Sequence, residues 1–110
     1  MLELYNTPHS TCSQKVRICL AEKNLEWTDQ QVNLATKVHL TPKYLKINPN
    51  GVVPTFIHNG TIITDSSVIC EYIDEVFPEP ALTPAEPAQK AAMRAWLHFI
   101  EEVPTVAVRV

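Results

Sequence analysis

The stretch Val53–Thr64, with the sequence VPTFIHNGTIIT, decides the fold of this chain. Its apolar and β-branched residues form two short runs, and Asn59-Gly60 stands between them. This dipeptide favours the two-residue turn of a β-hairpin, because both residues tolerate a positive φ. The sequence therefore predicts antiparallel strands over residues 53–58 and 61–64.

The residues before this hairpin predict a parallel crossover. Residues 2–5 alternate as in a half-buried strand, and residues 27–33 are typical of a second strand. Between them, Thr11 and Gln14 have the spacing of a capping box, which predicts a helix with Thr11 as its N-cap. A short helix that opens at Thr41-Pro42 follows the second strand.

A further helix follows the hairpin. Thr64 or Asp65 caps it, apolar residues recur at helical spacing, and Pro78 ends it. The predicted order is strand, helix, strand, helix, strand, strand, helix. A mixed sheet with helices on both faces is a thioredoxin-like α/β plan.

The distribution of prolines predicts a domain boundary. Four of the nine prolines fall within residues 78–87, a composition typical of a linker. We expect a thioredoxin-like domain over residues 1–78 and a proline-rich linker over residues 79–87. Residues 88–110 are then the start of a truncated, all-helical domain.

The helical pattern over residues 88–103 supports this division. Its apolar stripe consists of Met93, Trp96, Leu97 and Ile100. One helix cannot bury such a stripe by itself, so we expect more of a helical domain to cover it. The alternative is that this helix folds back on the first domain or pairs with another copy of the chain.

Composition excludes several functional classes. A net charge of −3 with 19% charged residues gives no basic surface for nucleic acid. The apolar runs are too short for a membrane span, and the first residues lack the pattern of a secretion signal. Three cysteines form no complete disulfide framework, and no Cys or His spacing fits a metal site. We expect a cytoplasmic protein without metal, nucleic-acid or membrane partners.

The first candidate site is the segment Ser10-Thr11-Cys12-Ser13, where the first strand meets the first helix. Free N–H groups and the positive end of the dipole at a helix N-terminus stabilise an anion such as a thiolate. If Thr11 and Gln14 cap the helix, Ser10 is free to donate a hydrogen bond to that anion. The alternative is that all four residues only cap the helix.

Two further segments carry candidate chemistry. Val53-Pro54 is a candidate cis-proline, which would expose main-chain groups of Val53 to a peptide-like ligand. The alternative there is an ordinary trans proline. In Asp65-Ser66, the N–H and hydroxyl of Ser66 suit a carboxylate and Asp65 suits an ammonium, as in an amino-acid head group. The alternative is a simple N-cap pair.

Three motifs in this order resemble those of a known family, the soluble glutathione S-transferases. STCSQKVRI at residues 10–18 is similar to the active-site stretch of the zeta- and tau-like classes. NPNGVVPT at residues 48–55 resembles their cis-proline loop, and TDSSVICEYI at residues 64–73 resembles their γ-glutamyl motif. The similarity is to the amino-terminal domain of that family and runs from residue 2 to about residue 103. The stretch through Phe77-Pro78 also resembles bacterial transferases that cleave aryl ethers.

The resemblance implies glutathione as co-substrate and assigns residues to its sulfur. Ser10, seven residues before Arg17, would hydrogen-bond the thiolate and lower the pKa of the thiol. Cys12 would assist, and Ser13 is the alternative to Ser10. The nucleophile is then the sulfur of glutathione and not a protein atom.

The resemblance also implies partners for the rest of the tripeptide. Val53, held by Pro54, would pair its main chain with the cysteinyl part, and Asp65 and Ser66 would hold the γ-glutamyl end.

One position departs from the family pattern. Val52 stands where a Gln or Lys is frequent, so the glycine carboxylate needs another partner. Lys37 and His39 are the candidates, and a solvated loop is the alternative role for both.

The function implied is activation of the glutathione thiolate for attack on an electrophilic small molecule, as in detoxification, by a homodimer. Glutathione-dependent isomerisation or ether cleavage, and thiol redox chemistry at Cys12, are alternative enzymatic functions. A non-catalytic protein-interaction module is another. Because the helical domain builds most of the electrophile pocket in this family, a chain of 110 residues can bind glutathione and still be inactive.

Overall fold

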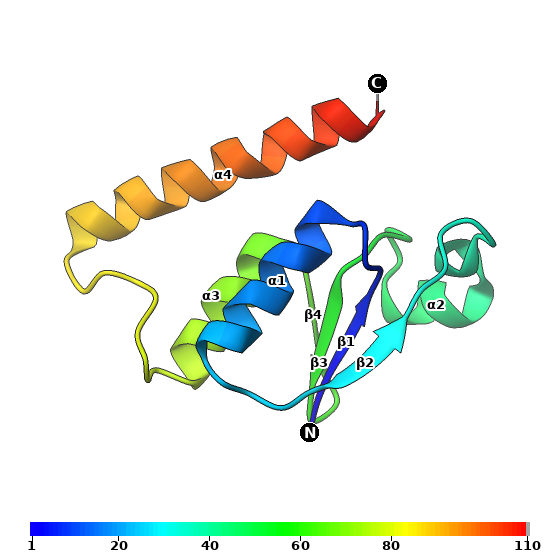
Figure 1. Ribbon diagram of the computed structural model, residues 1–110, viewed down its shortest axis with the longest axis horizontal. Coiled ribbons are helices and arrows are strands. Elements are labelled where there is room, and N and C mark those ends of the chain that lie inside the picture. Colours follow the sequence, from blue (N-terminus) through cyan, green and yellow to red (C-terminus); the bar gives the residue numbers. More distant parts are fainter. Residues whose placement is uncertain (110) are drawn as a thin grey trace.

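A four-stranded mixed sheet forms the centre of the structure, a computed structural model that describes the backbone of residues 1–109 and the side chains of residues 1–100 (Figure 1). Its strands are β1 (Leu2–Asn6), β2 (Thr28–Gln31), β3 (Thr55–His58) and β4 (Thr61–Thr64). In the sheet order β2-β1-β3-β4, β1 runs parallel to β2 and antiparallel to β3, and β3 runs antiparallel to β4. The predicted thioredoxin-like plan is confirmed.

The β3–β4 hairpin has the predicted turn, but two strands are shorter than predicted. Asn59 and Gly60 have φ values of 50° and 89°, and His58 pairs with Thr61 across the turn. β3 begins at Thr55 and not at residue 53, because Pro54 has no N–H to donate to a ladder. β2 is likewise shorter than the predicted range 27–33.

Helices cover both faces of the sheet. Figure 1 shows α1 (Thr11–Glu22) and α3 (Ser66–Val76) side by side on one face. On the other side lie α2 (Pro42–Ile47) and a short 3₁₀ helix, η1 (Val38–Leu40), which the sequence did not predict. The start of α2 is as predicted, because the side chain of Thr41 accepts a hydrogen bond from a main-chain N–H in its first turn.

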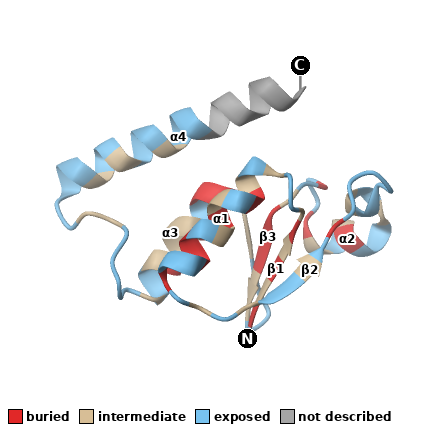
Figure 2. Cartoon of the chain, in the orientation of Figure 1, coloured by how far each residue is buried: buried red, intermediate tan, exposed pale blue. Residues whose placement is uncertain are grey.

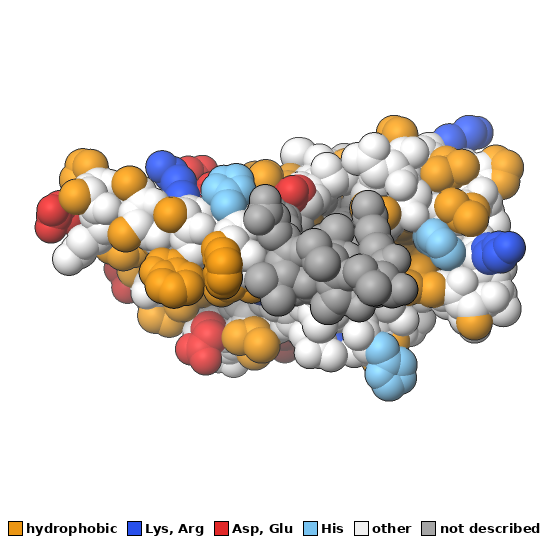
Figure 3. Space-filling view, turned by 90° about the horizontal axis from the view of Figure 1, so that it is seen from above, with side chains coloured by type: hydrophobic (Ala, Val, Ile, Leu, Met, Phe, Trp, Pro, Cys, Tyr) orange, Lys and Arg blue, Asp and Glu red, His pale blue; other side chains and the backbone are white. Residues whose placement is uncertain are grey.

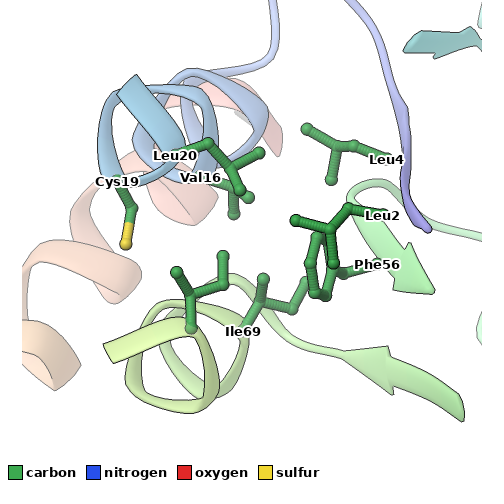
Figure 4. Close-up of a cluster of buried hydrophobic side chains, with 8 residues drawn as sticks. Leu2, Leu4, Val16, Cys19, Leu20, Phe56 and Ile69 are labelled. Carbon is green, nitrogen blue, oxygen red and sulfur yellow. The ribbon is translucent and has the colours of Figure 1, made fainter. Parts of the chain in front are cut away.

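The main core lies between the sheet and the α1–α3 pair (Figures 2 and 4). Its members are Leu2, Leu4, Val16, Cys19, Leu20, Phe56, Ile69 and Ile73. Burial of each large apolar side chain contributes about 1.5–3 kcal/mol. On the opposite face of β1, Tyr5 packs edge-on against Tyr44 of α2, with ring centroids 5.9 Å apart. Both faces of β1 are therefore fixed, and so is the loop that follows it.

The last helix, α4 (Pro87–Arg109), contacts α1 and α3. The helix predicted over residues 88–103 is thus confirmed and is longer than predicted. Its apolar stripe does not lie on one buried face, because Met93 and Leu97 are half-buried whereas Trp96 is 65% exposed. Figure 3 looks onto the outer side of α4 and shows hydrophobic side chains along it. No helix in the described part of the chain is long and apolar enough to cross a membrane.

A buried ion pair fastens the linker to the first domain. The side chain of Lys23, just after α1, is fully buried, and its Nζ lies 2.6 Å from an Oδ1 of Asp74 in α3. Lys23 also donates to the carbonyl of Pro80. Asp74 accepts a hydrogen bond from the N–H of Leu82 at 2.8 Å. These contacts hold residues 80–82 against the ends of α1 and α3, a connection that the sequence did not predict.

Candidate functional site

The sheet register brings the three predicted segments to one edge. Tyr5 of β1 pairs with Thr55 of β3, and Thr55 pairs with Thr64 of β4. The chain leaves β1 toward Ser10, enters β3 from Val53 and leaves β4 toward Asp65. Because the paired residues stand in one row across the sheet, the three segments meet beside that row.

Ser10, not Thr11, is the N-cap of α1. Ser10 has an extended backbone (φ −73°, ψ 122°), and its Oγ accepts a hydrogen bond from the N–H of Ser13 at 3.1 Å. The predicted capping box is wrong, because Thr11 is already the first helical residue and the amide of Gln14 donates to the carbonyl of Pro8 instead. A serine hydroxyl that accepts from the main chain still has its own proton to donate. The cap bond therefore fixes the oxygen of Ser10 and leaves a donor for an anion.

The two other sulfur-site candidates have different surroundings. Cys12, in the first turn of α1, is half-buried and is one of three free cysteines. Ser13 is fully buried, and its Oγ accepts a long hydrogen bond of 3.5 Å from the N–H of Thr7. Ser10 is half-buried and so is more accessible to a ligand than Ser13.

Two residues that the sequence did not suggest hold the loop before Ser10. The guanidinium of Arg17 donates to Asn6 Oδ1 at 2.6 Å and to the carbonyls of Thr7 and Pro8 at 3.2 and 3.0 Å. Asn6 is fully buried and donates to Asp29 Oδ1 at 2.7 Å. The available signal in the sequence was a polar Asn directly after the strand predicted over residues 2–5, which the structure shows to be the last residue of β1. This network positions Ser10 relative to the sheet.

The loop before β3 is held on one side and free on the other. The Val53–Pro54 peptide bond is cis. The Tyr44 hydroxyl donates to the carbonyl of Val52 at 2.6 Å, and the Asn48 amide donates to the same carbonyl at 3.2 Å. Within the described residues, the main chain of Val53 itself makes no hydrogen bond. Its N–H and C=O are thus available to an extended ligand.

Glycine is required at position 51 of this loop. Gly51 has a φ of +62°, and a Cβ there would lie 3.2 Å from the carbonyl oxygen of His39 and from a methyl of Leu45. We expect Gly51→Ala to lower the free energy of unfolding by about 2 kcal/mol, through the left-handed backbone and the crowding together. Urea unfolding measures this.

Gly60→Ala is the matched control for Gly51→Ala. Gly60 has a φ of +89°, but a Cβ added there would meet nothing within 4 Å. It should carry only the backbone cost. Equal losses in the two variants would contradict the crowding at Gly51.

At the start of α3, Asp65 and Ser66 have distinct roles. Asp65, with a φ of 74°, caps the helix, and its Oδ1 accepts from the N–H groups of Ser67 and Val68 at 3.0 and 3.4 Å. The predicted capping by Asp65 is confirmed. Ser66 is only 2% exposed, and its Oγ has no hydrogen-bond partner among the described residues. A buried hydroxyl without a partner is costly, which points to a polar ligand.

A small hollow lies beside this helix start. Its volume is about 80 Å³, and its lining consists of Asp65, Ser67, Val68, Glu71, Arg94, Leu97 and His98. Both α3 and α4 therefore contribute walls to this hollow, and Ser66 is not among its lining residues. Among the described residues, no group of three or more His, Cys, Asp or Glu side chains could hold a metal ion.

The two candidates for the glycine carboxylate differ in position. Lys37 is exposed and has a left-handed backbone with a φ of 59°. His39 is half-buried, and its Nδ1 is buried without a partner among the described residues. Since the carbonyl of His39 also approaches Gly51, His39 lies against the loop that carries Val53. The geometry thus favours His39 over Lys37.

The arrangement suits a peptide-like ligand with an amino-acid head group and a central anion. A family model described as the glutathione S-transferase N-terminal domain matches residues 4–81. The chain belongs to the glutathione S-transferase family. This membership confirms the resemblance inferred from the three motifs.

Curated members of the family show which branches are similar to this chain. LigF of Sphingobium sp. strain SYK-6 is 39% identical over 103 residues, which cover 92% of this chain and 40% of LigF. A zeta-class glutathione S-transferase of Euphorbia esula is 41% identical over 90 residues, which cover 82% of this chain and 40% of that protein. The chain thus spans about 40% of the length of these curated relatives.

Solved structures of the family share the fold. The crystal structure of the β-etherase LigF matches with a TM-score of 0.85 over 92% of this chain and 42% of LigF, at 39% identity. A glutathione transferase homologue from Sulfitobacter, solved with bound glutathione, has a TM-score of 0.86 and 34% identity, over 92% of this chain and 49% of that chain. A family member of this architecture therefore binds glutathione.

Proposed function

We propose that this chain forms the glutathione site of a glutathione S-transferase, which activates the thiolate for attack on an electrophilic small molecule. The observation that carries the proposal is the buried, unpartnered Oγ of Ser66, next to the capping carboxylate of Asp65. An α-amino acid head group has a carboxylate, to which the hydroxyl of Ser66 can donate, and an ammonium, from which the carboxylate of Asp65 can accept. The γ-glutamyl end of glutathione is such a group.

The other candidate residues would contact the remaining parts of the tripeptide along its length. The free main chain of Val53 pairs with the cysteinyl part, and His39 is the candidate for the glycine carboxylate. The hydroxyl of Ser10 donates to the sulfur, with Cys12 assisting. Because a donor aimed at an anion stabilises the thiolate over the thiol, it increases the fraction of reactive sulfur at neutral pH.

Ser66→Ala tests this proposal. A hydrogen bond to a charged group contributes about 1.5–3 kcal/mol, so the variant should bind glutathione about 10-fold more weakly or worse. Because the Oγ of Ser66 has no partner to lose, stability of the free protein should be unchanged or higher. Isothermal titration with glutathione and urea unfolding give the two values.

The unaltered chain is the reference in that experiment. Undetectable glutathione binding by it at millimolar concentration would disprove the proposal. A Ser66→Ala variant with unchanged affinity would remove Ser66 from the site.

Glutathione-dependent ether cleavage is a second candidate reaction. It is favoured by the similarity to LigF, whose structure is described as that of a β-etherase. The name of another relative, a probable maleylacetoacetate isomerase of Caenorhabditis elegans at 40% identity over 92 residues, points to isomerisation instead. Mass spectrometry of glutathione adducts formed from an aryl ether would distinguish ether cleavage from isomerisation, which leaves no adduct.

We also propose the domain plan, cellular location and oligomeric state expected from the sequence. Residues 1–78 form the glutathione domain, 79–87 the linker and 88–110 the start of an all-helical domain, which is supported by the exposed Trp96 on α4.

Free cysteines are consistent with a cytoplasmic location. Exposed apolar side chains on α3, such as Val68, support a homodimer, which analytical ultracentrifugation would detect.

A further inference from the structure

A lysine in α1 reaches the start of α3. The Nζ of Lys15 donates a hydrogen bond of 2.8 Å to the Oγ of Ser67, which is buried. The two residues are 52 positions apart in the chain, and Figure 1 shows their helices side by side. The ammonium of Lys15 is thus held at the first turn of α3 by Ser67, the residue that follows Ser66 in the chain.

This is an unfavourable place for a positive charge. The N-terminus of a helix carries a positive partial charge, so a cation there is repelled and an anion is attracted. The first turn of α3 has no acidic residue, and the carboxylate of its cap Asp65 already accepts two main-chain N–H groups. Among the described residues, Lys15 makes no ion pair with Asp65 or with a residue of that turn.

Two cations near the two helices pair with carboxylates. Among the described residues, Lys15 and Arg17 do not, and Arg17 is held instead by Asn6 and two main-chain carbonyls. Lys23 pairs with Asp74 at 2.6 Å, and Arg94 pairs with Glu71 at 3.2 Å. In the described part of the chain, no carboxylate lies within 4.0 Å of the half-buried Lys15. The strong interaction of the Lys15 ammonium is a hydrogen bond to one neutral hydroxyl. The positive potential around the ammonium can therefore attract an anion.

The orphaned hydroxyl of Ser66 lies at the same helix end and points to a ligand independently of Lys15. Ser66 is 2% exposed and its Oγ has no partner among the described residues. Since both donors lie at the first turn of α3, one carboxylate that reaches the two of them would accept from Ser66 and from the ammonium of Lys15. It would satisfy the orphaned hydroxyl and neutralise the cation at once.

We infer that Lys15 is a further ligand-binding residue, which recognises the α-carboxylate at the γ-glutamyl end of glutathione beside Ser66. This inference rests on the proposed function. In this arrangement the α-carboxylate of the head group contacts Lys15 and Ser66, and its ammonium contacts Asp65. Lys15 would thereby determine selectivity for ligands that carry an α-carboxylate.

The test compares two ligands against two variants. Glutathione is compared with 4-aminobutyryl-Cys-Gly, which keeps the amine and thiol but lacks the α-carboxylate. We expect Lys15→Met to weaken glutathione binding about tenfold and to leave the analogue unaffected. Lys15→Arg, which keeps the charge, should restore most of the preference for glutathione. Isothermal titration gives the ratio of the two affinities, which cancels any loss of folded protein common to both ligands.

Arg94→Met is the matched control. Arg94 lines the hollow beside Ser67, but its charge is already paired with Glu71, so its removal should leave the affinity ratio unchanged. If Lys15→Met weakens both ligands equally, or neither, the assignment of Lys15 is wrong and the proposed function stands. If the unaltered chain binds neither ligand, the proposed function and this inference both fail.

Discussion

Replacement of Asp74 by asparagine should lower the free energy of unfolding by about 3–5 kcal/mol, the cost of removing one partner from a buried ion pair. The variant leaves the fully buried ammonium of Lys23 facing a neutral amide. It also weakens the hold on the linker, because Asp74 accepts from the N–H of Leu82. Urea unfolding followed by circular dichroism would measure the loss.

The same ion pair predicts an acid-dependent stability. Partial burial by itself would raise the pKa of Asp74, but hydrogen bonds from Lys23, Thr83 and Leu82 outweigh burial and lower the pKa below 3.8. A lowered carboxyl pKa stabilises the folded state fully above the ordinary value. That stabilisation is lost as pH falls through the lowered pKa. The unaltered protein should therefore lose this stabilisation below about pH 4, whereas Asp74→Asn should lack that component.

Glu71→Gln is the matched control for Asp74→Asn. Glu71 pairs with Arg94 on the surface, where both side chains are partly exposed to water. Exposed pairs contribute about 0–1 kcal/mol, so this variant should be nearly as stable as the unaltered protein. If both variants lost a similar free energy of unfolding, the burial of the Lys23–Asp74 pair would not make it more stabilising than the surface pair.

Replacement of Ser10 by alanine should raise the thiol pKa of bound glutathione by about one unit, which corresponds to about 1.4 kcal/mol of lost thiolate stabilisation. The structure adds a second effect, because Ser10 is also the N-cap of α1. Loss of a serine cap costs about 1 kcal/mol of stability. Thiolate absorbance against pH, measured at saturating glutathione, reports the first effect, and urea unfolding reports the second.

Ser10→Asp separates the two roles of Ser10. Aspartate accepts from the N–H of Ser13 and caps α1, but it has no proton to donate at neutral pH and repels a thiolate. It should keep the stability of the fold and lose the pKa shift. If the shift survives in Ser10→Asp, Ser10 does not activate the sulfur. Ser13→Ala and Cys12→Ser then test the other two candidates.

Parts of the candidate site were predictable from local sequence because local chemistry determines them. Thr41 and Asp65 cap helices through contacts with N–H groups two or three residues away. Asn59-Gly60 forms its turn for the same local reason. The choice between Ser10 and Thr11 as the cap of α1 was predicted wrongly. Both are good capping residues, and the loop held by Arg17 decides which one is extended.

Long-range contacts supplied the features that no local pattern contained. Lys15 and Ser67 meet only because α1 and α3 pack in one register, and Lys23 meets Asp74 for the same reason. The free hydroxyl of Ser66 is likewise a property of its packed surroundings, since an exposed serine would be hydrated.

The sequence by itself determined the order of elements, the hairpin, and which segments carry polar chemistry, because these depend on residues close in the chain. Only the tertiary structure decided which side chains share a site and which charges lack a partner. Burial removes water from a polar group, so its state depends on neighbours that distant segments provide.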